Sequence, residues 1–157
     1  MIWLKRWWPA LLWAVVISCL STASFSAEHT SHYIVPFLRW LLPGASHQTI
    51  ELLHHLIRKC AHFTEYFILS LLILRGIRAG EKGWHFRWAL TTILIVAGYA
   101  ALDEFHQSFV PGRTAAVTDV LIDASGGIAA QLIAALVVLW GGVRKDRRET
   151  EAAAVSK

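Results

Sequence analysis

Two neighbouring stretches of the chain gather side chains that can transfer protons or bind ions. Asp103 and Glu104 stand in the stretch ALDEFHQSFVPGR, and Asp119 and Asp123 follow it at the spacing of one helical turn. Carboxylates serve as general acids and bases, and together with basic side chains they take part in binding cations and phosphate groups. The first stretch follows WALTTILIVAGYA, an apolar run suited to lipid. The polar groups are therefore expected at the edge of a membrane helix.

A third polar group lies earlier in the chain, in RKCAHFTEYFILSLLI. Lys59, His62 and Tyr66 follow one another at positions i, i+3 and i+7, so they share one face of a helix. Together with the amide and the arginine of the first stretch, they complete a set of candidate site residues. This set is Lys59, His62, Tyr66, Asp103, Glu104, Gln107, Arg113, Asp119 and Asp123.

The composition accounts for the apolar surroundings of these groups. The 157 residues leave room for one domain, and 55% of them are hydrophobic, with eight Trp, which indicates an integral membrane protein. The net charge of +4 does not indicate a nucleic-acid-binding protein, because no basic surface with interleaved aromatic residues is present. Cys19 and Cys60 form no CxxC pair, and no disulfide can be inferred from them.

Apolar segments of about 20 residues are long enough to cross a hydrocarbon core of about 30 Å. Four are predicted, over residues about 7–27, 60–78, 88–107 and 116–143, and a polar tail follows over 144–157. The predicted fold is all-α: a polytopic membrane protein, built as a compact four-helix transmembrane bundle in a single domain, 1–157. Lys5, Arg6 and the small residues of STASFSA leave a cleaved signal peptide as an alternative for the first segment.

Between the first two segments, SHQTIELLHHLIRK is expected to form a short amphipathic helix that lies in the membrane interface, over residues 46–59. Ser46 can cap this helix, and Ile50, Leu53 and Ile57 repeat at helical spacing. Its histidines fit either an exposed interfacial face or a metal site, but no carboxylate or cysteine recurs at a recognised ligand spacing. No metal is predicted, and the sequence does not name a cofactor.

The basic residues predict the orientation of the chain. With a cytoplasmic amino terminus, eleven Lys and Arg fall inside and four outside, in line with the positive-inside rule. The inner set is Lys5, Arg6, Arg75, Arg78, Lys82, Arg87, Arg144, Lys145, Arg147, Arg148 and Lys157, and the outer set is Arg39, Arg58, Lys59 and Arg113. We therefore expect a multi-pass protein of the bacterial cytoplasmic (inner) membrane, with both termini in the cytoplasm.

In this topology, polar residues from three helices meet at one depth near the outer surface. They can form a functional pocket, or they can pair with one another and only lock the helices together. Five carboxylates face two or three basic side chains, and the excess negative charge requires protons, hydration or a cation. Glu65 and Glu104 can instead lie on the opposite helix face from their polar neighbours and meet headgroups or water. Gly98, Gly126 and Gly127 are expected to let the helices pack closely.

Taken together, these residues resemble the VanZ-like family of small bacterial integral membrane proteins, named after a teicoplanin-resistance protein. The resemblance covers residues about 58–135 and is carried by RKCAHFTEYFILSLLI and DEFHQSFVPGRTAAVTDVLIDASGG. It departs from the family at Asp123, where members often carry Asn, and it leaves the outer segment before Arg58 uncovered. The resemblance implies a role at the cell envelope, with tolerance of teicoplanin-type glycopeptide antibiotics as one expected outcome.

The expected function is an outward-facing polar pocket that binds or acts on a cell-envelope lipid or a lipid-linked wall precursor. The expected partners are such lipids and, for a packing role, another membrane protein. Enzyme activity stays open: His62 with Asp119 can exchange protons, but the chain contains no GxSxG or HExxH pattern. The alternatives are a structural subunit, in which the polar residues only hold helices together, and a membrane hydrolase or transferase.

Overall fold

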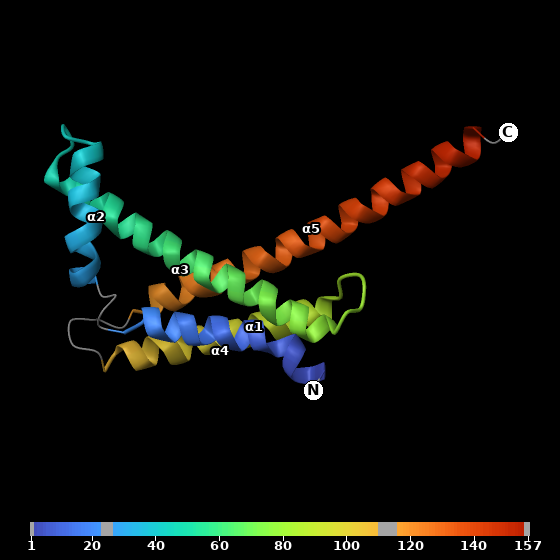
Figure 1. Ribbon diagram of the computed structural model, residues 1–157, viewed down its shortest axis with the longest axis horizontal. Helices are drawn as coiled ribbons and strands as arrows, with labels where there is room; N and C mark the ends of the chain where they lie inside the picture. The colour runs from blue at the N-terminus through green and yellow to red at the C-terminus, as the bar shows by residue number, and fades with distance from the viewer. Residues whose placement is uncertain (1, 23–26, 110–115, 156–157) are drawn as a thin grey trace.

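The computed structural model describes residues 2–22, 27–109 and 116–155, with side chains for all of these except residues 2, 27–29, 143 and 145–155. The described part contains five helices and no strand (Figure 1). In chain order they are α1 (Ile2–Leu20), α2 (Ala27–Leu41), α3 (His47–Arg78), α4 (Phe86–Gln107) and α5 (Val117–Val155). The prediction of an all-α fold is confirmed.

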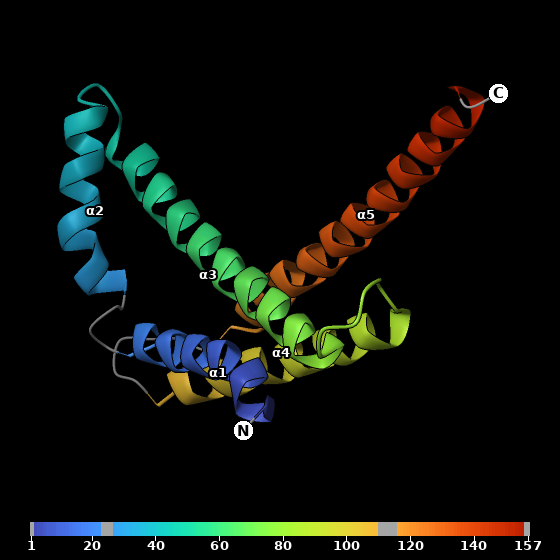
Figure 2. The ribbon, with the colours of Figure 1, turned by 45° about the vertical axis from the view of Figure 1, so that its right-hand side comes forward.

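The helices are arranged as two crossing pairs. α1 and α4 lie side by side and run in the same direction (Figures 1 and 2). α3 and α5 cross each other over this layer, and α3 contacts α1, α2, α4 and α5. The first part of α3 and the last part of α5 rise away from the layer on opposite sides, so the bundle is more open than predicted.

α3 joins two elements that the sequence was expected to keep apart. The interfacial helix predicted over 46–59 and the span predicted over 60–78 form one helix of 32 residues. No Pro or Gly interrupts it before Gly76, whereas Pro43 and Gly44 stand before its start. Ser46 caps it as predicted, its side chain accepting a hydrogen bond from the Thr49 N–H at 3.2 Å. At 1.5 Å per residue α3 is about 48 Å long, more than a bilayer core requires.

The separate short helix of the outer segment is α2, the 15 residues from Ala27 to Leu41. It begins 19 residues earlier than the interfacial helix of the prediction, 27 against 46. α2 contacts α3 and runs across the direction of α1 and α4 in both views (Figures 1 and 2). Pro36 lies inside this helix on an exposed position, and it is tolerated there although it cannot donate a backbone hydrogen bond.

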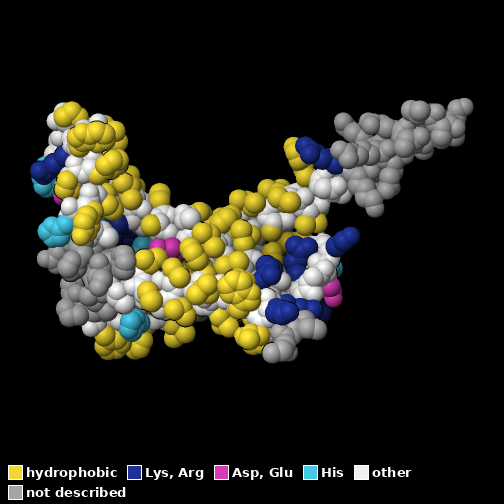
Figure 3. All heavy atoms as spheres, viewed as in Figure 1, with side chains coloured by type: hydrophobic (Ala, Val, Ile, Leu, Met, Phe, Trp, Pro, Cys, Tyr) yellow, Lys and Arg dark blue, Asp and Glu magenta, His cyan; other side chains and the backbone are white. Residues whose placement is uncertain are grey.

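Three helices are long and apolar enough to cross a membrane: His47–Arg78, Phe86–Gln107 and Val117–Gly142. The described part of α1 is not among them, and its 19 residues include Lys5 and Arg6. Apolar side chains cover the middle of the molecule in Figure 3, and Lys and Arg gather at the end where α1 begins and α3 ends. This separation of apolar and basic surface is that of a protein embedded in a bilayer.

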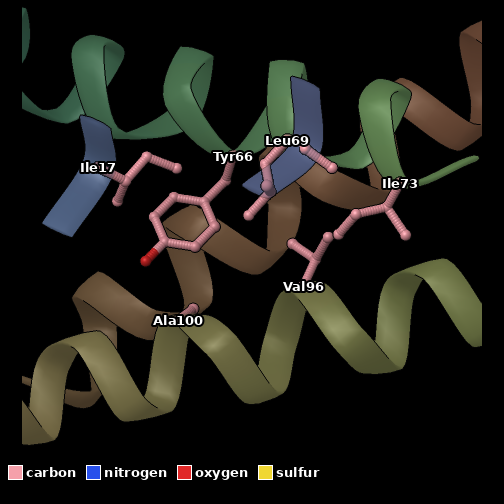
Figure 4. Close-up of a cluster of buried hydrophobic side chains, with 7 residues drawn as sticks. Ile17, Tyr66, Leu69, Ile73, Val96 and Ala100 are labelled. Atoms are coloured by element: carbon pink, nitrogen blue, oxygen red, sulfur yellow. The ribbon is translucent and has the colours of Figure 1, made fainter. Parts of the chain in front are cut away.

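The core fills the space between the two pairs of helices. Figure 4 shows Ile17, Tyr66, Leu69, Ile73, Val96 and Ala100, which come from α1, α3 and α4. α5 approaches this core through two glycines: a Cβ on Gly126 would lie 2.2 Å from the Phe63 carbonyl oxygen, and one on Gly127 2.7 Å from Val96 Cγ1. Both glycines therefore permit the close packing expected of them. Gly98 does not, because a Cβ there would meet no atom within 4 Å.

Candidate functional site

The candidate residues come together at one end of the bundle. α1 and α4 end there, α5 begins there, and the middle of α3 passes over it (Figures 1 and 2). Eight of the nine predicted residues lie in the described part of the chain and are called the polar cluster below. They are Lys59, His62, Tyr66, Asp103, Glu104, Gln107, Asp119 and Asp123. Arg113, the ninth, lies outside the described residues, as do Pro111 and Gly112.

Lys59 of α3 and Asp119 of α5 form an ion pair. Their side chains are 23% and 26% exposed, so the pair is partly shielded from solvent. Asp119 also lies in the first turn of α5, where the helix dipole favours a negative charge. The pair joins α3 to α5, and the positive charge of Lys59 balances the negative charge of Asp119.

His62 and Asp123 meet one turn further into the bundle. His62 Nδ1 lies 3.5 Å from Asp123 Oδ1, and Asp123 is 2% exposed. A carboxylate that accepts a hydrogen bond from Nδ1 orients an imidazole for proton exchange at Nε2, but at this distance His62 Nδ1 and Asp123 Oδ1 form no hydrogen bond with each other. The sequence suggested His62 with Asp119 as the acid–base pair, but the structure places Asp123 beside His62 and Asp119 beside Lys59.

The Tyr66 side chain is fully buried, and Figure 4 shows its hydroxyl pointing from α3 toward Ala100 on α4. Within the described part of the chain, neither this hydroxyl nor Asp123 Oδ1 has a hydrogen-bond partner. Asp103 and Asp123 both interact electrostatically with Tyr66. Buried polar atoms in native proteins are nearly always hydrogen-bonded, so these two atoms indicate a place where a polar group can bind.

Asp103 and Gln107 of α4 form a network with α1. Asp103 Oδ2 accepts hydrogen bonds from Ser21 Oγ at 2.6 Å and from Gln107 Nε2 at 2.7 Å, and all three side chains are buried. Gln107 Nε2 also donates to Ser21 Oγ at 3.2 Å. Ser21 was not predicted as part of the site, because its segment was considered only as the end of the first membrane helix or as a signal-peptide cleavage site. Its position just after α1, at the depth of the polar groups, is the signal that could have found it.

Glu104 fixes the start of α5. Its Oε1 accepts a hydrogen bond from the N–H of Ala116 at 2.6 Å, one residue before α5, and the side chain is buried. A carboxylate at this place also lies at the positive end of the helix dipole. The suggestion that Glu104 meets headgroups or water is therefore wrong, since the protein itself uses the group. Glu65 is half-buried and lines a cavity.

That cavity, called the α2 cavity below, has a volume of about 200 Å³ and lies between α2, α3 and the end of α1. Its polar lining comes from Ser21, Thr30, Arg58, His62 and Glu65, and its apolar lining includes Leu20, Ile34 and Ile57. Figure 3 shows basic, histidine and acidic side chains next to one another in the hollow between the α2–α3 arm and the α1–α4 layer. Ser21 and His62 connect this cavity to the buried polar cluster behind it.

The comparisons with known proteins identify the family. A family model described as VanZ/LLP1 matches residues 6–138 of the 157. The chain belongs to the VanZ/LLP1 family. The match is wider than the 58–135 on which the resemblance was identified, and it includes α1 from residue 6 onward, α2 and the whole of α3. No curated protein and no solved structure matches the chain.

In this VanZ/LLP1 protein, the described residues include no group of three or more His, Cys, Asp or Glu side chains placed to hold a metal. Cys19 and Cys60 are free and exposed. The three histidines at the start of α3 differ in their surroundings. His47 and His55 are exposed, while His54 is buried, with its Nε2 3.5 Å from Thr30 Oγ1 of α2. The polar cluster and the α2 cavity are thus the candidate site.

Proposed function

We propose that this VanZ/LLP1 protein binds the headgroup of an anionic cell-envelope lipid, or of a lipid-linked wall precursor, in the α2 cavity. The observation that carries the proposal is the mixed lining of that cavity, where Arg58 and His62 face the same space as Ile34 and Ile57. A lipid presents the matching combination, a charged headgroup next to an apolar chain. Wall-precursor binding would also explain tolerance of a glycopeptide antibiotic.

Arg58 is the side chain best suited to receive a phosphate. Lys59 is the other basic side chain at this end, but it pairs with Asp119 and does not line the α2 cavity, whereas Arg58 does. A guanidinium can donate two parallel hydrogen bonds to phosphate oxygens, which an ammonium cannot. Behind it, His62, Asp123 and the Tyr66 hydroxyl offer donors and acceptors to a hydroxyl or amide of the headgroup.

The test measures how tightly the purified protein retains phosphatidylglycerol relative to phosphatidylcholine, by native mass spectrometry. We expect Arg58→Ala to weaken phosphatidylglycerol retention about tenfold, because a lost charge-assisted hydrogen bond costs about 1.5–3 kcal/mol. Arg39→Ala is the matched control, since Arg39 lies exposed on α2 outside the cavity lining. Equal retention by the two variants would remove the proposal.

Protection of the envelope is the cellular form of the same test. In a strain that depends on this protein, Arg58→Ala is expected to accumulate in the membrane normally and to lose protection against a teicoplanin-type glycopeptide and against detergent. Loss of the protein from the membrane would instead favour the structural role, in which the charges mainly hold helices or a membrane-protein partner in place.

A second candidate function is acid–base catalysis on the bound lipid, and the pairing of His62 with Asp123 favours it. In a pair of this kind, a carboxylate that accepts a hydrogen bond from the imidazole orients it for proton transfer. We expect both His62→Ala and Asp123→Asn to abolish any product formed from a lipid-linked precursor, while lipid retention falls at most severalfold. Failure to detect product from such a precursor with the unaltered protein would leave binding as the function.

We also propose that the polar cluster faces outward in the bacterial inner membrane, with both termini in the cytoplasm. The basic residues near the start of α1 and the end of α3, at the opposite end of the bundle, support this orientation. Labelling of Cys60 in intact cells tests it, because Cys60 is exposed and lies beside Lys59 at the end with the polar cluster. Cys60 should react with a membrane-impermeant thiol reagent, and reaction only after cell lysis would reverse the orientation.

A further inference from the structure

α2 presents three different faces around its axis. The face toward α3 carries Thr30, Ile34 and Leu38, which are buried or half-buried and spaced four residues apart. A second face carries exposed apolar residues, called the aromatic stripe below: Tyr33, Phe37, Trp40 and Leu41, with exposed fractions of 82%, 57%, 76% and 55%. His32 and Arg39 lie on a third, exposed polar face.

This partition needs an explanation, because the aromatic stripe is not covered by the protein. Spacings of four, seven and eight residues place Tyr33, Phe37, Trp40 and Leu41 on one side of the helix. The rings of Phe37 and Trp40 lie 6.0 Å apart, so they form a continuous apolar surface. An apolar patch of this kind on a helix with a separate polar face is typical of a surface that meets another apolar phase.

The place of α2 in the fold decides which phase that is. α4 is a membrane-span candidate, and α2 runs across the direction of α1 and α4 (Figures 1 and 2). α2 is oblique to the other two candidates, α3 and α5 (Figures 1 and 2). The 22 residues of α4 span about 33 Å, close to the thickness of a hydrocarbon core, so a helix that runs across α4 beyond its end lies along the membrane surface, near the headgroups. Tyr and Trp are the residues most enriched at that depth.

We propose that α2 docks on the bilayer, with the aromatic stripe inserted at the boundary between headgroups and acyl chains. His32 and Arg39 then face water. Because Thr30 and Ile34 of the same helix line the α2 cavity, α2 would place this cavity beside the lipid headgroups. A ligand then enters from the bilayer rather than from water, a consequence that rests on the proposed function.

The experiment uses the full-length protein in vesicles of phosphatidylcholine with phosphatidylglycerol. Single nitroxide labels are attached at Phe37→Cys or Trp40→Cys, with His32→Cys and Arg39→Cys as matched controls on the polar face of the same helix. The background carries Cys19→Ser and Cys60→Ser, since both native thiols are free and exposed. Collision rates of each label with oxygen, which concentrates in lipid, and with a water-soluble nickel chelate are then measured.

Labels at Phe37 and Trp40 are expected to favour oxygen over the nickel chelate at least fivefold more than the control labels do. Equal preference at all four positions would overturn the proposal, because α2 would then lie entirely in water or entirely in lipid and not at the boundary between them. Protection of the stripe labels from both reagents would overturn it too and would indicate a second copy or another protein on this face. Lipid contact together with unchanged lipid retention by Arg58→Ala would keep the docking and remove the proposed headgroup site.

Discussion

The bundle buries polar side chains at two depths, and the two sets differ in charge and in hydrogen bonding. In its middle, Ser70 Oγ donates to the Gly127 carbonyl oxygen at 3.0 Å, and Gln131 Nε2 donates to Ser70 Oγ at 2.8 Å. These side chains are uncharged, and their donors are used within the protein. At the outer end the groups are ionisable, and the Tyr66 hydroxyl and Asp123 Oδ1 have no hydrogen-bond partner among the described residues.

The difference separates a helix lock from a candidate binding site. A polar group deep in hydrocarbon is costly unless the protein satisfies it, so the pair of Ser70 and Gln131 suits the task of holding α3 to α5. One atom of that pair, Gln131 Oε1, lacks a partner within the described part of the chain. Among the described residues, the outer cluster leaves the Tyr66 hydroxyl and Asp123 Oδ1 without hydrogen-bond partners, and His62 beside Asp123 lines the α2 cavity, as expected of a candidate ligand site.

The largest expected effect comes from the contact on which both depths depend, the approach of α5 to α3 at Gly126. Gly126→Ala would place a Cβ 2.2 Å from the Phe63 backbone oxygen, which must move. We expect a loss of about 2–3 kcal/mol of stability, together with reduced accumulation in the membrane. Gly141→Ala is the matched control, because a Cβ there meets no atom within 4 Å. Thermal unfolding of both variants in detergent measures the difference, and equal melting temperatures would contradict the close contact.

The next effect tests the mid-bundle lock. Ser70→Ala leaves the Gln131 amide without its short acceptor, so we expect a loss of about 1–2 kcal/mol. The double variant Ser70→Ala with Gln131→Leu removes both partners and should recover part of this loss. Lipid retention per folded molecule should not change in either variant. A fall in retention would show that the Ser70–Gln131 pair and the outer polar cluster act as one site.

The sequence predicted the helical class and the residues of the polar cluster, but not Ser21, because helix type and shared faces depend on local patterns. Hydrophobic runs of membrane length predict helices, and the i, i+3, i+7 spacing places Lys59, His62 and Tyr66 on one face. The pairing across helices was not predictable in the same way. Asp119 and Asp123 share a face of α5. Which of them lies beside His62 depends on the position of α3 along the axis of α5, and the sequence does not give this position.

The outer segment was harder to predict, for a related reason. Residues 46–59 carry an amphipathic pattern and a cap, but these signals do not show whether the next helix continues from them. α3 continues past residue 59 because no Pro or Gly interrupts it there. α2, in contrast, forms although it contains Pro36. The pattern of Tyr33, Phe37 and Trp40 was available in the sequence as the alternative signal for an interfacial helix.

A smaller effect is expected from removing the hydroxyl of Tyr66 or of Tyr99. The rings of these two tyrosines are neighbours, with centroids 6.1 Å apart. The Tyr99 hydroxyl donates to the Ala14 carbonyl oxygen at 2.7 Å and lies 2.8 Å from Ser18 Oγ, so Tyr99→Phe should cost about 1 kcal/mol of stability. Tyr66→Phe should cost almost none, because its hydroxyl has no hydrogen-bond partner among the described residues.

Ligand binding should reverse this order. Tyr66→Phe is expected to weaken retention of phosphatidylglycerol severalfold, whereas Tyr99→Phe should leave it unchanged. Thermal unfolding and native mass spectrometry of the two variants measure both quantities on the same samples. A large loss of stability in Tyr66→Phe would show that its hydroxyl is part of the fold and not of the binding site.

The smallest expected effect concerns the ion pair of Lys59 and Asp119, the strongest candidate for a purely structural role. A double-mutant cycle with Lys59→Met and Asp119→Asn should give a coupling of about 0.2–1 kcal/mol, as for partly exposed pairs. The exposed pair of His47 and Glu51, whose nitrogen and oxygen lie 3.9 Å apart, supplies a control with coupling near zero. Asp119 should tolerate the loss of Lys59 because the first turn of α5 favours its charge. A coupling above about 3 kcal/mol would mean a buried pair that locks α3 to α5, and the outer cluster would then resemble the mid-bundle lock.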